Sequence, residues 1–254
     1  MSGGHVHALY RHGTGPLHRM QPEVKIAATV AFVVAVVATP REAIWAFGVH
    51  ALVIAGLLVA GRIPPGFLAR RLLVALPFVL FAVFLPFLGG GERIDALGVS
   101  LSRAGLWAAW NILAKALLGA SASIVLAATT QVPEILVGLT RLRVPRIFVS
   151  IMGFMVRYLD VVIGELGRMR VALRSRGYAP RRLRDARPLA ATLGTLFVRS
   201  YERGERVYLA MLSRGFTGTM PVTDRASAGA MQWAGAAAVV TLAAATAATG
   251  WLLR

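Results

Sequence analysis

Five long apolar segments constrain the fold of this chain more than any other feature of its sequence. They cover residues 24–39, 43–60, 72–88, 104–130 and 231–253. A helix needs about 20 mostly apolar residues to cross the hydrocarbon core of a bilayer, and each segment approaches or exceeds that length. Hydrophobic residues make up 57% of the chain, whereas soluble domains contain roughly 45–50%. The sequence therefore predicts an all-α integral membrane protein with about five transmembrane helices.

A basic, polar stretch separates the fourth apolar segment from the fifth. Residues 131–230 carry 17 arginines against 7 acidic residues. Within this stretch, apolar residues recur at helical spacing along two segments that begin near residues 147 and 188. These patterns predict two long amphipathic helices that lie on or just under the membrane. The alternative is that residues 146–167 cross the bilayer as a sixth helix, at the cost that the charges of Arg157 and Asp160 carry in hydrocarbon.

The distribution of arginine predicts the orientation of the chain. The N-terminal tail, the loop after the second apolar segment and the long polar stretch are basic, whereas the loops after the first and third segments are nearly balanced. Because basic loops stay in the cytoplasm, we expect a multi-pass protein of the inner (cytoplasmic) membrane with a cytoplasmic N-terminus. The expected parts are a cytoplasmic tail (1–22), four transmembrane helices (23–130), a cytoplasmic region of amphipathic helices (131–230) and a C-terminal transmembrane helix (231–254).

One heptapeptide occurs twice in the basic stretch. The sequence ALRSRGY at residues 172–178 recurs 38 residues later as AMLSRGF at residues 210–216. A glycine just past a helix end and an arginine in the last turn are common helix-terminating features, which is the purely structural interpretation. Two matched copies indicate a binding role in addition, because arginine offers a rigid fork of hydrogen-bond donors that suits carboxylates. The repeat predicts two arginine-bearing helix ends that engage two similar partners or one symmetric partner.

The sequence contains few residues suited to catalysis or to metal binding. Cysteine is absent and the acidic residues are scattered. His5 and His7 form either a weak site for a divalent transition metal or part of a polar tail. No P-loop motif and no nucleic-acid-binding motif accompanies the net charge of +17. We therefore predict that the protein is not an enzyme and has no catalytic residue, cofactor or metal site. We expect its positive charge to contact the lipid bilayer and acidic protein partners, and not nucleic acid.

Three charged residues inside predicted helices allow more specific expectations. Lys115 in the fourth apolar segment is either an ion-pathway residue or a residue that serves helix packing. Asp160 is expected to pair with Arg157 within one helix. Glu165 is expected to pair in the same way with Arg168, as a structural contact.

Several segments resemble the transmembrane T component of energy-coupling factor (ECF) transporters, and most closely its cobalt-transport branch, CbiQ. They are LHRMQPEVK at residues 17–25, FMVRYLD at residues 154–160 and the two Ser-Arg-Gly helix ends. The resemblance extends over essentially the whole chain. The chain departs from the family pattern at Ser175 and Ser213, where the family usually has alanine.

The resemblance implies a scaffold that transmits the ATP-driven motion of two ABC ATPases to a separate substrate-binding membrane subunit, the S component. The implied ATPase-coupling residues are those of the helix ends, Ser175, Arg176, Gly177, Ser213, Arg214 and Gly215. The implied S-component face consists of apolar residues of the two amphipathic helices, Ile147, Ile151, Phe154, Leu193, Leu196 and Phe197. The implied cargo is cobalt or nickel. A vitamin is the alternative cargo, and a basic membrane scaffold or insertase is the alternative to a transport role.

Overall fold

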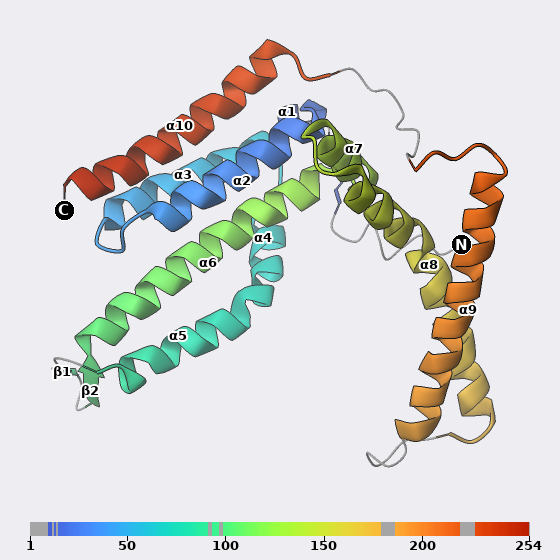
Figure 1. Cartoon of the computed structure of the whole chain (residues 1–254). Coiled ribbons are helices and arrows are strands. Elements are labelled where there is room, and N and C mark those ends of the chain that lie inside the picture. Colours follow the sequence, from blue (N-terminus) through green and yellow to red (C-terminus); the bar gives the residue numbers. More distant parts are fainter. Residues whose placement is uncertain are drawn as a thin grey trace. The chain divides into compact units, whose positions relative to one another are not determined.

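The computed structural model describes residues 10–11, 13, 15–90, 93–96, 99–178, 186–218 and 227–253, and most of them are helical (Figure 1). The helices are α1 (Pro16–Arg19), α2 (Pro22–Ala38), α3 (Ile44–Ala60), α4 (Pro65–Leu72), α5 (Leu76–Leu88), α6 (Arg103–Thr129), α7 (Val132–Arg141), α8 (Arg146–Ser175), α9 (Ala186–Leu212) and α10 (Ala230–Leu252). A short 3-10 helix, η1 (Leu73–Ala75), joins α4 to α5. Strand β1 (Arg93–Ala96) pairs antiparallel with β2 (Val99–Ser102) between α5 and α6, a hairpin that the sequence patterns did not indicate.

The chain divides into two compact units. One unit contains α1 to α7 and α10, and the other contains α8 and α9. The two long amphipathic helices predicted from the sequence are therefore α8 and α9. The division between the units falls between Leu142 and Arg143, so α7, which belongs to the basic stretch in sequence, packs with the apolar helices.

Four of the described helical segments are long and apolar enough to cross a membrane. They are Pro65–Leu88, Arg103–Thr129, Arg146–Ser175 and Ala230–Leu252, and Ile44–Ala60 is a shorter apolar helix. The first predicted segment becomes α2, with 17 residues. Because α8 has the length and composition of a span, the structure is compatible with the alternative that residues 146–167 form a sixth span. The prediction of an all-α, multi-pass membrane protein is confirmed.

Helix α2 occupies the centre of the first unit and contacts α6, α7 and α10. A buried core joins α2, α3, α6 and α10 through Phe32, Ala35, Val36, Ile54, Ala122 and Ala243. Small residues allow the helices to approach closely: a Cβ on Gly105 of α6 would overlap the backbone of Leu85 and Pro86 in α5. Such small residues are typical of helix contacts in membranes, where packing takes over much of the role of the hydrophobic effect.

Side chains from two other helices satisfy the carbonyl groups at the end of α2. The last carbonyls of a helix lack partners within the helix, and an unsatisfied carbonyl is costly in hydrocarbon. Lys115 Nζ of α6 donates to the carbonyl of Val37 at 2.7 Å. Trp251 Nε1 of α10 donates to the carbonyl of Ala38 at 2.8 Å. These contacts favour the packing interpretation of Lys115 over the ion-pathway interpretation.

Candidate coupling site

The first copy of the heptapeptide ends α8 in a Schellman motif. Gly177 has a φ of +75°, a conformation that favours glycine because it has no Cβ. The amide of Tyr178 donates to the carbonyl of Leu173 at 3.1 Å, and the amide of Gly177 donates to the carbonyl of Arg174 at 2.9 Å. These are the two hydrogen bonds that define the motif, so the heptapeptide itself determines where α8 ends.

The second copy ends α9 in the same way. Gly215 has a φ of +81°. The amide of Phe216 donates to the carbonyl of Met211 at 3.0 Å, and the amide of Gly215 donates to the carbonyl of Leu212 at 3.0 Å. The sequence repeat is therefore a structural repeat down to individual backbone hydrogen bonds.

At both helix ends the arginine is exposed and directly precedes the left-handed glycine. The serines before Arg176 and Arg214 are satisfied locally, because the hydroxyl groups of Ser175 and Ser213 each donate to the carbonyl three residues earlier at 3.0 Å. Both serine side chains are therefore accommodated by local hydrogen bonds within the helix ends. The guanidinium groups project from two defined backbone positions.

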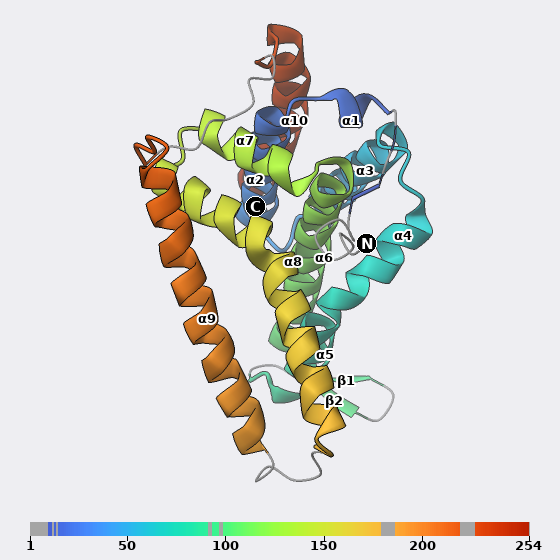
Figure 2. The ribbon, with the colours of Figure 1, turned by 90° about the vertical axis from the view of Figure 1, so that its right-hand side faces the viewer.

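Helices α8 and α9 run antiparallel, so the two arginine-bearing ends lie at opposite ends of the helix pair (Figure 2). The end of α8 lies beside the start of α9, while the end of α9 lies toward the start of α8 (Figure 1). The two ends are thus separated by the length of the pair. This separation suits two partner surfaces better than a single small one.

One buried carboxylate joins the two helices. Glu165 of α8 has only 6% of its surface exposed and binds two arginines of α9. Arg203 Nη2 lies 2.8 Å from one carboxylate oxygen, and Arg199 Nη1 lies 3.3 Å from the other. The expected pairing of Glu165 with Arg168 is therefore corrected, because the face of α8 that carries Glu165 turns toward α9. Removing one partner of a buried ion pair leaves a charge uncompensated. The contact therefore stabilises the register of α8 and α9 in which Glu165 meets Arg199 and Arg203.

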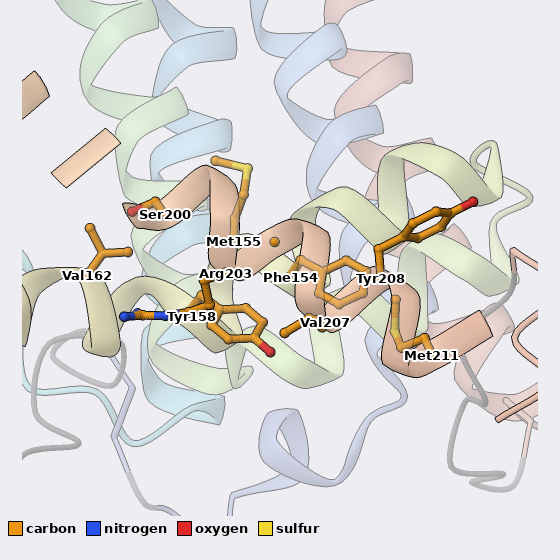
Figure 3. A pocket seen from close by; sticks show the side chains of 10 residues that line it. Phe154, Met155, Tyr158, Val162, Ser200, Arg203, Val207, Tyr208 and Met211 are labelled. Carbon is orange, nitrogen blue, oxygen red and sulfur yellow. The ribbon is translucent and has the colours of Figure 1, made fainter. Parts of the chain in front are cut away.

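An open groove of about 380 Å³ lies between α8 and α9 (Figure 3). Its lining is mostly aromatic, aliphatic or methionine and includes Phe154, Met155 and Tyr158 of α8 and Val207, Tyr208 and Met211 of α9. The Phe154 and Tyr158 rings stack with their centroids 6.4 Å apart. Methionine is flexible and polarizable, so this groove suits an apolar contact that can adjust its shape.

The predicted S-component face is mostly exposed. Four of its residues lie on the outside of the helices, Ile147, Ile151, Leu193 and Phe197. Phe154 lines the groove, whereas Leu196 is buried, at 7% exposed, and supports the packing of the unit. Exposed apolar residues in this number mark a surface that protein or lipid covers.

The surroundings of the two helix ends differ. Arg176 lines a basic groove of about 460 Å³ together with Arg168 of α8 and Arg199 of α9. In the second copy the residue aligned with Arg168 is Arg206, which lies 3.9 Å from Glu202 of its own helix. The first end therefore concentrates more positive charge and suits an acidic surface.

A second buried carboxylate, which the sequence analysis did not single out, anchors the chain on both sides of the α8–α9 segment. Glu23 at the start of α2 accepts a hydrogen bond from Arg141 Nη1 at 2.9 Å and another from the amide of Ala228 at 3.2 Å. Arg141 precedes α8 in the chain and Ala228 follows α9. A Cβ on Gly138 would lie only 3.0 Å from backbone atoms of Glu23 and Pro22, so α7 packs tightly at the same place. The only sequence signal was the position of Glu23 within the motif at residues 17–25.

The described residues do not assemble a metal site. His5 and His7 lie outside the described residues, so the proposed histidine pair is untested. His18 donates to a backbone carbonyl, and His50 is fully buried and hydrogen-bonded with Thr39 at 3.1 Å. Across the described ranges, no three His, Asp or Glu side chains are grouped so as to hold a metal ion.

Comparison of the sequence with known proteins places the chain in a family. The family of cobalt transport proteins, CbiQ, matches residues 13–223. A protein of Methanocorpusculum labreanum named as a fused cobalt transport protein CbiMQ is 25% identical over 217 residues, which are 82% of this chain but only 36% of that protein. The energy-coupling factor transporter transmembrane protein EcfT of Bacillus selenitireducens is 26% identical over 223 residues, 82% of each chain. An uncharacterized protein of Methanocaldococcus jannaschii is 27% identical over 168 residues, 64% of this chain and 63% of that one.

The family match covers well over half of the chain and includes the motif at residues 17–25 and both arginine-bearing helix ends. Proteins of this kind are transmembrane components of transporters and are not themselves catalytic, which agrees with the prediction that the chain is not an enzyme. The chain belongs to the CbiQ family, whose members are transmembrane T components of ECF transporters.

Proposed function

We propose that this T component transmits the ATP-driven motion of two ABC ATPase subunits to a substrate-binding S component in the same membrane. The pair of matched helix ends carries the proposal. Arg176 and Arg214 are both exposed, and each follows its helix at a backbone position set by a Schellman motif. A guanidinium held in this way can enter an acidic groove on a soluble partner. Because the ends lie at opposite ends of the pair, each ATPase receives one arginine.

The internal symmetry of the helix pair supports a paired partner. Glu165 and Arg203 are 38 residues apart, which is also the offset of the sequence repeat, so the ion pair joins equivalent positions of the two copies. Each position lies 12 residues before the glycine of its copy, or about 18 Å along the helix at a rise of about 1.5 Å per residue. The helical segment from the ion pair to the terminal glycine therefore has the same length in α8 and in α9. Equal segments suit two ATPase subunits of the same size.

Motion reaches the S component through the apolar surface of the same helices. In this proposal the face comprises Ile147, Ile151, Phe154, Leu193, Leu196 and Phe197, with Leu196 contributing from within the unit. The ion pair of Glu165 joins α8 and α9, so displacing either helix end also displaces this face. Residues 1–22 and the coupling-helix region at 131–230 lie in the cytoplasm, where the ATPases bind ATP, and residues 231–254 form the last transmembrane helix.

Cobalt is the proposed cargo, with nickel as the related metal. The support is the family match and the name of the fused relative. A vitamin is the alternative, because a T component that carries no substrate site of its own can serve S components of different specificity. Uptake of cobalt, nickel and vitamins by cells that contain the complete transporter distinguishes these cargoes.

Co-purification tests the coupling proposal. The chain is expressed with the S component and the ABC ATPases of the same cell, as wild type and as Arg176→Ala/Arg214→Ala. We expect the double variant to remain in the membrane with its S component but to lose nearly all bound ATPase. Arg170→Ala/Arg206→Ala removes two other arginines of the same helices and is expected to retain ATPase. Equal ATPase recovery with wild type and with the Arg176/Arg214 variant would contradict the proposal.

A further inference from the structure

A separate basic site in the unit of apolar helices brings two arginines onto one aromatic ring. The guanidinium carbon of Arg11 lies 5.5 Å from the centroid of Phe67, and that of Arg71 lies 5.2 Å from it. Both distances are within the range of a cation–π contact. Two positive charges that share one ring repel each other, so an anion that binds both lowers the energy of the arrangement.

Backbone contacts hold this site in place. The amide of Arg11 donates to the carbonyl of Ala128 near the end of α6 at 3.0 Å, and the carbonyl of Arg11 accepts from His18 Nε2 at 3.1 Å. Phe67 packs against a buried cluster of Ile63, Val125 and Ala128. The two arginines are thus brought together by the fold, before any ligand binds.

The site lies where the chain leaves one apolar helix and enters the next. α3 ends at Ala60, and the following candidate span begins at Pro65, so we infer that this turn lies at the level of the lipid headgroups. Residues 10–25 and 61–75, which flank the start of α2 and the end of α3, contain six Lys or Arg residues and one acidic residue, Glu23. Glu23 forms an ion pair with Arg141. The charge of the surface therefore complements an anionic ligand.

An apolar cavity beside the same cluster favours a lipid over a free anion. The cavity has a volume of about 260 Å³, and Leu17 and Leu57 are among its lining residues. The same two leucines pack against the cluster that holds Phe67. A phospholipid offers a phosphate for the arginines and an acyl chain for the cavity, whereas inorganic phosphate offers only the former.

We propose that Arg11, Phe67 and Arg71 bind the headgroup of an anionic phospholipid at the membrane surface. The arginine forks hydrogen-bond the phosphate oxygens, and the negative surface of the leaflet attracts both cations. The bound lipid connects the N-terminal segment to α4 and to the end of α6. This role is independent of the coupling function of Arg176 and Arg214.

Thermal unfolding of the purified full-length chain in neutral detergent tests this proposal. Tryptophan fluorescence is followed while phosphatidylglycerol, phosphatidylcholine or inorganic phosphate is added at the same concentrations. We expect phosphatidylglycerol to raise Tm in a saturable way and the other two additives to leave it nearly unchanged. An equal rise with phosphatidylcholine would overturn the requirement for an anionic headgroup, and an equal rise with phosphate would overturn the lipid as ligand.

Variants locate the effect. Arg11→Ala/Arg71→Ala is expected to raise the half-saturating phosphatidylglycerol concentration by roughly ten- to thirty-fold. Arg19→Ala/Arg41→Ala lowers the net charge equally and is expected to titrate like wild type. An unchanged titration of the first variant, or an equal loss in the second, overturns the site. If the first variant does not fold, Arg11→Lys/Arg71→Lys keeps both charges without the planar fork. It is then expected to bind at least threefold more weakly, and wild-type binding by it overturns the site.

Discussion

The carboxylate of Glu165 on α8 accepts a hydrogen bond of 2.8 Å from Arg203 on α9 and so joins equivalent positions of the two sequence copies. Arg199 binds the other oxygen of the same carboxylate at 3.3 Å. The contact links the two amphipathic helices, although most of their surface is exposed. In the proposed coupling function, a force on either arginine-bearing end passes to the other helix through this contact.

Glu165→Gln is expected to lower both the stability of the helix pair and the efficiency of coupling. The amide keeps the shape of the side chain but removes the charge that Arg199 and Arg203 share. We expect Tm to fall by several degrees and the complete transporter to move less cargo per ATP hydrolysed. The measurements are thermal unfolding, together with uptake and ATPase rates in proteoliposomes.

Glu202→Gln is the control for that variant. Glu202 is 56% exposed and lies 3.9 Å from Arg206 in its own helix, and exposed pairs of this kind contribute little. The change is expected to leave Tm and coupling near wild type. An equal effect of both substitutions would show that loss of negative charge, and not the contact between the helices, is responsible.

Gly177→Ala and Gly215→Ala are expected to distort the arginine-bearing ends. Both glycines have a φ near +80°, where a residue with a Cβ costs about 1–2 kcal/mol. We expect each variant to lower the free energy of unfolding by that amount and to reduce ATPase co-purification severalfold.

Gly167→Ala is the control, because Gly167 lies in the interior of α8 with open space around it. It is expected to stabilise the helix by about 0.5–1 kcal/mol. Normal ATPase recovery with both end variants would refute the role of the Schellman geometry.

Gly138→Ala is expected to push α7 away from α2. A Cβ at this position would lie 2.8 Å from Cδ1 of Ile26 and 3.0 Å from the backbone of Glu23. Overpacking of this kind costs about 1–3 kcal/mol and strains the ion pair of Glu23 with Arg141. Denaturant unfolding of the purified protein measures the loss. Gly119→Ala in α6, where a Cβ meets open space, is the matched control and should not be destabilised.

Lys115→Met is expected to reduce stability while leaving uptake per folded molecule intact. The variant leaves the carbonyl of Val37 without its donor, at a cost of about 1–2 kcal/mol. Ser123→Ala in the same helix is the control, because that hydroxyl bonds only to its own helix. Abolished uptake with unchanged stability would instead support the ion-pathway interpretation of Lys115.

Much of the secondary structure and the local form of the candidate coupling site were predictable from the sequence. The apolar segments specify helices, because in a membrane the backbone must satisfy its own hydrogen bonds. The two heptapeptides specify their helix ends, because a Schellman motif involves only residues up to five apart and a glycine that tolerates positive φ. Arg176 and Arg214 could therefore be assigned to matched, exposed ends before the fold was known. The short hairpin of β1 and β2 and the packing of α7 left no comparable signal.

Local sequence specifies which residues form helices and where the two arginine-bearing helices end. Which residues contact one another depends on the tertiary structure. Glu165 binds residues 34 and 38 positions away in place of its neighbour on the helix, and Lys115 reaches a carbonyl 78 positions away. Periodicity defines the apolar face of a helix but not the helix that packs on it or the register of the contact. Those choices depend on close packing among many side chains at once, and they place the two arginine-bearing helix ends at opposite ends of one helix pair.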